Sequence, residues 1–88
     1  MASGVKYDMF IVYKTLSALR DSETKSLNIV ELAESAKVSP TTLEKYIEVL
    51  KSRGFVIEKR NKERRIHITA KVEGFLFLFS RLLALWGE

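Results

Sequence analysis

The sequence predicts a small, mostly helical α+β domain whose elements follow the order helix, helix, helix, strand, strand, helix. Apolar residues recur at helical spacing in four separate stretches. Two short runs rich in β-branched and aromatic residues, at 55–58 and 65–69, predict paired strands. The 88 residues suit a single domain, 1–88, with a core at 6–69 and a further C-terminal helix at 70–88.

The first helix is expected at residues 6–20, where an apolar stripe recurs at spacings of three and four: Met9, Val12, Leu16 and Leu19. The polar residues 21–26 predict a loop. A short strand near Ser26 and Leu27 could add a third strand to the predicted hairpin. The fold class is therefore α+β with a two- to three-stranded sheet.

Two short helices joined by about three residues follow. Asn28 with Glu31 resembles a capping box and predicts the start of the second helix. Ser39 is a favourable N-cap and Pro40 suits the first position of the third helix. Gly54 tolerates the left-handed conformation that ends a helix. Such a pair of helices is the helix-turn-helix unit, although Lys37 stands where the turn usually has a glycine.

The net charge is concentrated in one segment. The chain carries 15 Lys and Arg against 11 Asp and Glu, a net charge of +4. Residues 59–65 hold five basic residues and one acid, which accounts for the whole excess. With strands ending at 58 and beginning at 65, we expect residues 59–64 to form a hairpin tip that contacts phosphates. These basic residues are Lys59, Arg60, Lys62, Arg64 and Arg65.

The chain resembles a winged helix-turn-helix transcriptional regulator. The resemblance rests on the helix-turn-helix at 28–54, the exit through Phe55 and Val56, the basic tip, and Ile68-Thr69 before the last helix. More narrowly, it is similar to small archaeal winged-helix DNA-binding proteins that dimerise through a C-terminal helix. This resemblance implies that the third helix enters the major groove of double-stranded DNA and that the wing lies on phosphates.

Helical geometry selects the side chains on the third helix that would meet DNA. The side opposite Leu43 and Ile47 carries hydroxyl and basic residues near the helix start. The candidates are Ser39, Thr41, Thr42 and Lys45. Glu44 and Glu48 share this region; either could accept from a cytosine amine, but we favour ion pairing with Lys51.

The last helix is apolar on nearly all sides, so one core cannot bury it alone. We expect a homodimer that pairs this helix with its mate, and a palindromic or repeated DNA site. Cover by the aromatic residues of the first helix and docking on a membrane surface are the alternatives. The interface is predicted at Phe75, Phe77, Leu78, Phe79, Leu82, Leu85 and Trp86.

The sequence predicts no enzyme. No nucleophile–base set, paired carboxylates or glycine-rich phosphate loop is evident, and the absence of cysteine excludes disulfides and thiolate metal sites. His67 is expected on the outer face of the wing. No cofactor, metal or small-molecule ligand is expected, and the location is expected to be the cytoplasm, on the nucleoid. The alternatives to a gene regulator are a protein–protein module of the same fold and a general nucleoid protein.

Overall fold

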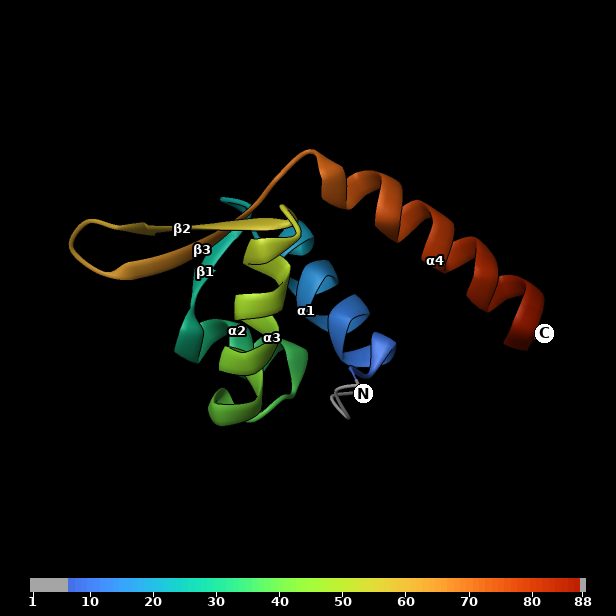
Figure 1. Cartoon of the computed structure of the whole chain (residues 1–88), viewed down its shortest axis with the longest axis horizontal. Coiled ribbons are helices and arrows are strands. Elements are labelled where there is room, and N and C mark those ends of the chain that lie inside the picture. The colour runs from blue at the N-terminus through green and yellow to red at the C-terminus, as the bar shows by residue number, and fades with distance from the viewer. Residues whose placement is uncertain (1–6, 88) are drawn as a thin grey trace, which may run out of the picture.

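The computed structural model describes residues 7–87, which form four helices and one three-stranded antiparallel sheet (Figure 1). The mostly helical α+β fold with a C-terminal helix is thereby confirmed. Residue 6, the expected start of the first helix, lies outside the described residues. The elements are α1 (Met9–Asp21), β1 (Ser26–Asn28), α2 (Ile29–Ala36), α3 (Pro40–Ser52), β2 (Val56–Arg60), β3 (Arg64–Ile68) and α4 (Lys71–Gly87).

The core lies where α1, α2 and α3 meet one face of the sheet. Leu16 of α1, Leu32 of α2 and Ile47 of α3 are fully buried there, together with Ile66 of the central strand. The three helical residues come from apolar stripes at helical spacing, and Ile66 comes from the predicted second strand of the hairpin. Burying a side chain of this size contributes about 1.5–3 kcal/mol, so this cluster positions α3 against the sheet.

The start of each helix in the helix-turn-helix is capped by its own side chain. Asn28 and Glu31 form the predicted capping box: the Asn28 side chain accepts from the Glu31 amide at 2.8 Å, and Glu31 accepts from the Asn28 amide at 3.2 Å. Ser39 caps α3 by accepting from the Thr42 amide at 3.3 Å. Between the two helices, Lys37 adopts the left-handed conformation with φ of 60°, which is why a glycine is usual at this position.

The sheet has the order β1–β3–β2, and the predicted third strand is confirmed as its edge. The predicted hairpin tip at 59–64 is too long, because β2 continues through Arg60 and β3 begins at Arg64. Lys59 pairs with Arg65 and Arg60 with Arg64, so only residues 61–63 form the turn. Like charges directly opposite one another disfavour pairing. Carboxylates beneath the strands offset this repulsion, and the charge pattern alone does not reveal them.

The base of α4 is fastened to the end of α3. Gly54 has a positive φ of 81°, and its carbonyl accepts from the Thr69 hydroxyl at 2.7 Å. The Lys71 ammonium donates to the Arg53 carbonyl at 2.8 Å and lies 5.3 Å from the centre of the Phe55 ring. From this joint α4 runs outward, and its far end stands clear of the rest of the fold (Figure 1).

In residues 7–87, none of the helices combines the length and the apolar character that crossing a bilayer requires.

Candidate nucleic-acid interface

The amino-terminal end of α3 presents hydroxyl and basic side chains, as the helical geometry predicts. Thr41 and Lys45 are exposed. The hydroxyl groups of Ser39 and Thr42 lie 3.0 Å apart, and Ser39 also caps the helix, so both are engaged at its first turn. Because the first amides of a helix point outward and carry partial positive charge, this end of α3 suits an anion such as phosphate.

The wing presents its basic side chains in two groups. Lys59 and Lys62 are exposed, and no ion pair to either occurs among residues 7–87. Arg60 is also exposed, with its Nε 2.8 Å from the Glu58 carboxylate. The remaining two residues, Arg64 and Arg65, are partly covered and turned toward acidic and hydroxyl groups of the protein itself. The free charge of the wing is therefore smaller than its composition indicates.

Arg64 joins the wing to α3. Its Nη1 and Nη2 atoms donate to the two carboxylate oxygens of Glu44 at 2.6 and 2.9 Å, and its Nε lies 3.0 Å from Glu58. Only 23% of the Arg64 side chain is exposed. The guanidinium group lowers the pKa of Glu44 below its usual value, which keeps this carboxylate charged.

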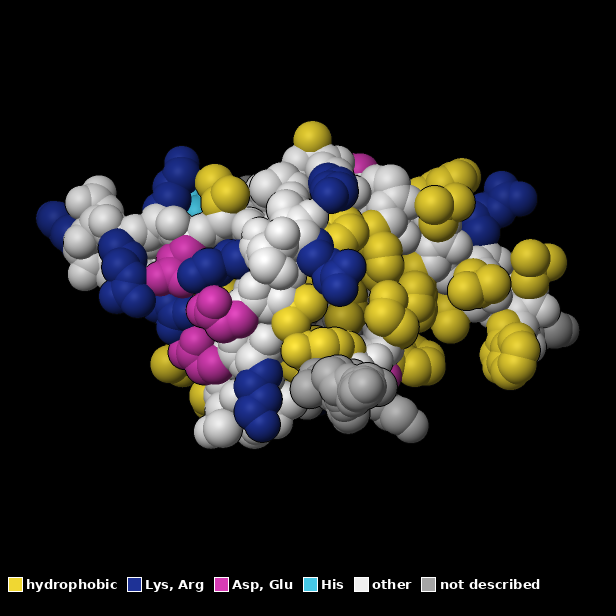
Figure 2. All heavy atoms as spheres, in the orientation of Figure 1, with side chains coloured by type: hydrophobic (Ala, Val, Ile, Leu, Met, Phe, Trp, Pro, Cys, Tyr) yellow, Lys and Arg dark blue, Asp and Glu magenta, His cyan; other side chains and the backbone are white. Residues whose placement is uncertain are grey.

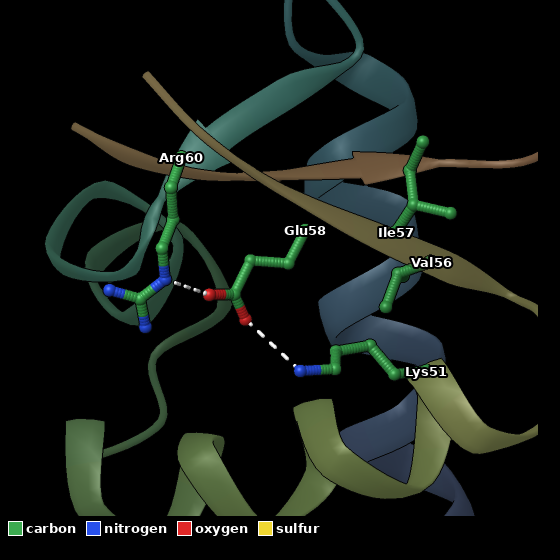
Figure 3. Close-up of a pocket in the computed structure, with 5 residues that line it drawn as sticks. All are labelled: Lys51, Val56, Ile57, Glu58 and Arg60. Carbon is green, nitrogen blue, oxygen red and sulfur yellow. Dashed lines mark hydrogen bonds and ion pairs between the residues drawn. The ribbon is translucent and has the colours of Figure 1, made fainter. Parts of the chain in front are cut away.

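Glu58 is the hub of the charged side chains beneath the wing. Its carboxylate lies between Lys51 of α3, at 3.2 Å, and Arg60, at 2.8 Å, as Figure 3 shows. The nearby guanidinium of Arg64, with these two cations, lowers the pKa of Glu58 to about 2. Val56 and Glu58 are two positions apart on β2, so the strand directs both toward α3.

This network corrects one expectation. Lys51 contacts Glu48 at 3.5 Å, as favoured from the sequence, but Glu44 pairs with Arg64 instead. Glu58 was not among the site residues expected from the sequence. The alternation of residues along β2 could have identified it as an inward-facing acid.

Arg65 lies on the opposite face of the wing. It contacts Glu63 at 2.7 Å and donates to the Ser26 carbonyl at 3.0 Å, so it fastens β3 to the edge strand β1. His67 shares this outer face and is half-buried. Burial, then the charges of Lys59 and Arg65, lower the pKa of His67, which keeps the imidazole neutral near pH 7.

The predicted interface residues of α4 divide into two sets. Phe75 and Phe79 turn inward, where Phe79 stacks on Tyr13 with ring centres 5.0 Å apart. The cover expected from the aromatic residues of α1 therefore exists, but it reaches only this side of α4. The other predicted residues are exposed, and apolar side chains are visible along α4 (Figure 2). By helical spacing, Phe77, Leu78 and Leu85 lie on the outer side of the helix, whereas Leu82 and Trp86 continue the side of Phe75 and Phe79 toward the end of α4.

A cavity of about 280 Å³ lies between α1, α3 and the start of α4. Tyr7, Val49, Phe55 and Phe75 help to line it, with Arg53 as a charged group in its wall. This cavity could not be expected from the sequence, because it depends on how three elements distant in sequence meet. Within the described part of the chain, no cluster of three His, Asp or Glu side chains is arranged to hold a metal ion.

Comparison with known families and structures agrees with this geometry. The family model described as "HTH domain" matches residues 12–63, from α1 to the wing turn. No curated protein matches the chain in sequence. This match supports the helix-turn-helix assignment.

Several solved structures share the fold. Sco5413, a MarR family transcriptional regulator from Streptomyces coelicolor, has a TM-score of 0.76 at 22% identity, with 89% of this chain and 61% of that chain covered. BpsR from Bordetella bronchiseptica has a TM-score of 0.77 at 17% identity, with 93% of this chain and 58% of that chain covered. The DNA binding of BpsR is regulated by 6-hydroxynicotinic acid. The transcriptional regulator MosR of M. tuberculosis has a TM-score of 0.64 at 28% identity, covering 89% and 63%.

The chain thus spans about three-fifths of the length of these proteins. Together with the family match, they confirm the winged helix-turn-helix and the resemblance to transcriptional regulators of that fold. The narrower likeness to archaeal proteins stays a prediction.

Proposed function

Because this chain belongs to the HTH-domain family, we propose that it binds double-stranded DNA as a homodimer and regulates transcription, with α3 in the major groove and the wing on neighbouring phosphates. The observation that carries the proposal is the contact between Arg64 and Glu44, which holds the basic wing beside the reading side of α3. One stretch of duplex can then meet both elements.

On α3, we assign base contact to Lys45 and Thr41, whose side chains are exposed. A lysine at this position can reach the acceptor atoms of a guanine edge. Ser39 and Thr42 are assigned to the phosphate backbone, because their hydroxyls already cap the helix and their backbone amides lie at its positive end. Phosphate contacts orient the helix, and the side chains in the groove then carry the specificity.

On the wing, we assign phosphate contact first to Lys59 and Lys62 and then to Arg60. The two lysines can turn toward a phosphate without breaking an ion pair that the structure describes. The ion pairs of Arg64 and Arg65 favour supporting roles for these two residues. Each phosphate neutralised by the wing releases counterions, so binding is expected to weaken steeply with salt.

The homodimer rests on the outer face of α4. Leu78 and Leu85 lie two helical turns apart on this face and are 67% and 82% exposed, and Trp86 is 87% exposed. A contiguous apolar surface of this kind usually marks an interaction site. A two-fold pairing of α4 with its mate would cover it and present two copies of α3 to the DNA.

Fluorescence anisotropy with mixed-sequence duplex DNA, across a salt series, tests the proposal. The parent is compared with Lys59→Gln/Lys62→Gln and with Lys14→Gln, which removes an exposed charge from α1 rather than from the wing or α3. We expect the double variant to lose affinity and about 1.8 units of the slope of log K against log salt, at about 0.9 per phosphate contact. Lys14→Gln should keep the parental slope.

A protein–protein module is the second candidate. The acidic side chains on and beside α3 favour it, since Glu44, Glu48 and Glu58 reduce the positive charge of that surface. If the parent binds no duplex even at low salt, the DNA-binding proposal fails and this candidate replaces it. If the parent does bind duplex, competition with unrelated duplex separates a sequence-specific regulator from a general nucleoid protein, because only the former keeps a preferred site.

A further inference from the structure

We infer that Arg64 is a positioning residue that locks the wing onto α3 and leaves phosphate contact to its neighbours. The inference rests on the proposed function, since it assigns a role within the same DNA-binding surface. It also reverses the assignment that composition favours, in which all five basic residues of the wing contact DNA.

The guanidinium group of Arg64 contacts two carboxylates from two different elements. Its two terminal nitrogens donate to both carboxylate oxygens of Glu44, at 2.6 and 2.9 Å, and its Nε lies 3.0 Å from a carboxylate oxygen of Glu58. Glu44 belongs to α3 and Glu58 to β2, so one side chain of β3 connects two other elements. Such a fork-like contact fixes direction as well as distance.

Releasing Arg64 from its two carboxylate partners would cost free energy. To reach a phosphate, it would leave Glu44 and Glu58, of which Glu58 is only 10% exposed. Both carboxylates would then remain charged near pH 7 beside a polyanion, because even the ordinary pKa of a glutamate, 4.5, lies well below neutral. Lys59 and Lys62 face no such loss, so they are better suited to bind phosphate.

The ion pair between Arg64 and Glu44 also favours DNA binding. Glu44 lies on the side of α3 that would approach the duplex, and an unpaired carboxylate there would repel phosphates. Arg64 compensates this charge and also keeps the wing at a fixed distance from α3. DNA can then meet both elements at once, without first ordering one against the other.

A lysine cannot replace Arg64 in this role, although it can bind phosphate. The ammonium group is a compact point charge, whereas the planar guanidinium donates to both oxygens of Glu44 while its Nε lies 3.0 Å from Glu58. Arg64→Lys therefore separates the two roles. If Arg64 were a phosphate contact, the lysine variant would retain affinity and salt slope; if Arg64 positions the wing, both Arg64→Lys and Arg64→Gln lose affinity with little change in slope.

The experiment measures duplex binding across a salt series and thermal unfolding without DNA. The variants are Arg64→Lys, Arg64→Gln, Glu44→Gln and the double variant Glu44→Gln/Arg64→Lys, with Lys62→Gln as the matched control from the same wing. We expect Arg64→Lys to bind about tenfold more weakly, within the range for residues that couple neighbouring elements. Lys62→Gln should lower the salt slope by about 0.9 and leave the melting temperature unchanged.

In the unfolding measurement, Arg64→Lys and Glu44→Gln should each lower the melting temperature. The double variant should melt no lower than the less stable of the two single variants. Such non-additivity identifies a direct coupling between the two residues. Additive effects at these positions, or parental DNA binding by Arg64→Lys at every salt concentration, would overturn the inference. If the parent itself fails to bind duplex, the proposed function falls, while the unfolding cycle still decides whether Arg64 couples the wing to α3.

Discussion

The hydroxyl of Tyr46 accepts a hydrogen bond from the backbone amide of Asp8 at 2.7 Å, which ties α3 to the residue that caps α1. The edge of the Tyr46 ring also meets Tyr7, with ring centres 5.4 Å apart. Tyr46 is buried on the same side of α3 as Leu43 and Ile47, but apolar spacing gives no sign that its hydroxyl has this partner 38 residues away. Tyr46 thus orients the reading helix as well as filling the core.

Tyr46→Phe should therefore destabilise the fold by about 1 kcal/mol, the usual net contribution of one hydrogen bond. Chemical denaturation of the two proteins measures the difference. Tyr13→Phe serves as the control, because the described contacts of Tyr13 are made by its ring, which stacks on Phe79. Equal stability of parent and Tyr46→Phe would mean that this bond does not help to hold α3 in place.

Lys37→Gly should stabilise the protein. Lys37 holds the left-handed conformation at the turn between α2 and α3, which costs a residue with a Cβ about 1–2 kcal/mol. The gain should be about 1 kcal/mol, or a rise of about 4–8 °C in melting temperature for a domain of this size. Lys37→Ala, which keeps the Cβ, should not show it. A glycine variant no more stable than the alanine variant would refute the strain argument.

Leu78→Glu/Leu85→Glu should convert a dimer to a monomer, since each substitution places an unpaired charge on the exposed apolar face of α4. Sedimentation velocity measures the change. Ser80→Glu is the matched control, because Ser80 is also exposed on α4 but lies away from the side that carries Leu78 and Leu85. If the parent sediments as a monomer at every concentration tested, the dimer proposal is wrong.

The stability of the fold should fall in acid through Glu58. Its pKa is about 2 in the folded protein, below its ordinary value of 4.5, so the folded state binds fewer protons between these values than the unfolded state. The contribution of Glu58 is therefore complete above about pH 5 and is lost as the pH falls from 4.5 toward 2.

Melting curves of the parent and Glu58→Gln test this dependence. The difference between them should be largest near pH 7, at about 1 kcal/mol, and should shrink toward zero below pH 3. Glu48→Gln is the control, since Glu48 is more exposed and contacts a single cation. A difference between parent and Glu58→Gln that is independent of pH would show that the carboxylate charge does not stabilise the wing.

The helices were predictable from sequence because each has a continuous apolar stripe, and α2 and α3 also have a local capping signal. Asn28 and Ser39 act within three residues of their partners, so no knowledge of the fold is needed to recognise them. The wing was less predictable. Its strands include Lys59 and Arg60, which have weak strand propensity and lie opposite Arg65 and Arg64 of β3. The Glu44 carboxylate that meets Arg64 comes from α3 and reaches it only in the folded protein.

The ion-pair partners in the candidate site could not be predicted from the sequence either. The sequence identified the basic residues but not their partners, because Arg64 and Glu44 are 20 residues apart and meet only when the wing folds over α3. The alternation along β2 indicates on which side Glu58 lies, but not which cations it meets. Predicting those pairs requires the relative placement of the sheet and α3.

The joint at the base of α4 has a consequence for the geometry of an assembled dimer. Thr69 and Lys71 bind the carbonyls of Gly54 and Arg53, so α4 leaves the body directly from the end of α3. The direction of the α4 axis is thereby fixed relative to the axis of α3. In a dimer joined through α4, the angle between these two axes would set how many base pairs separate the two half-sites.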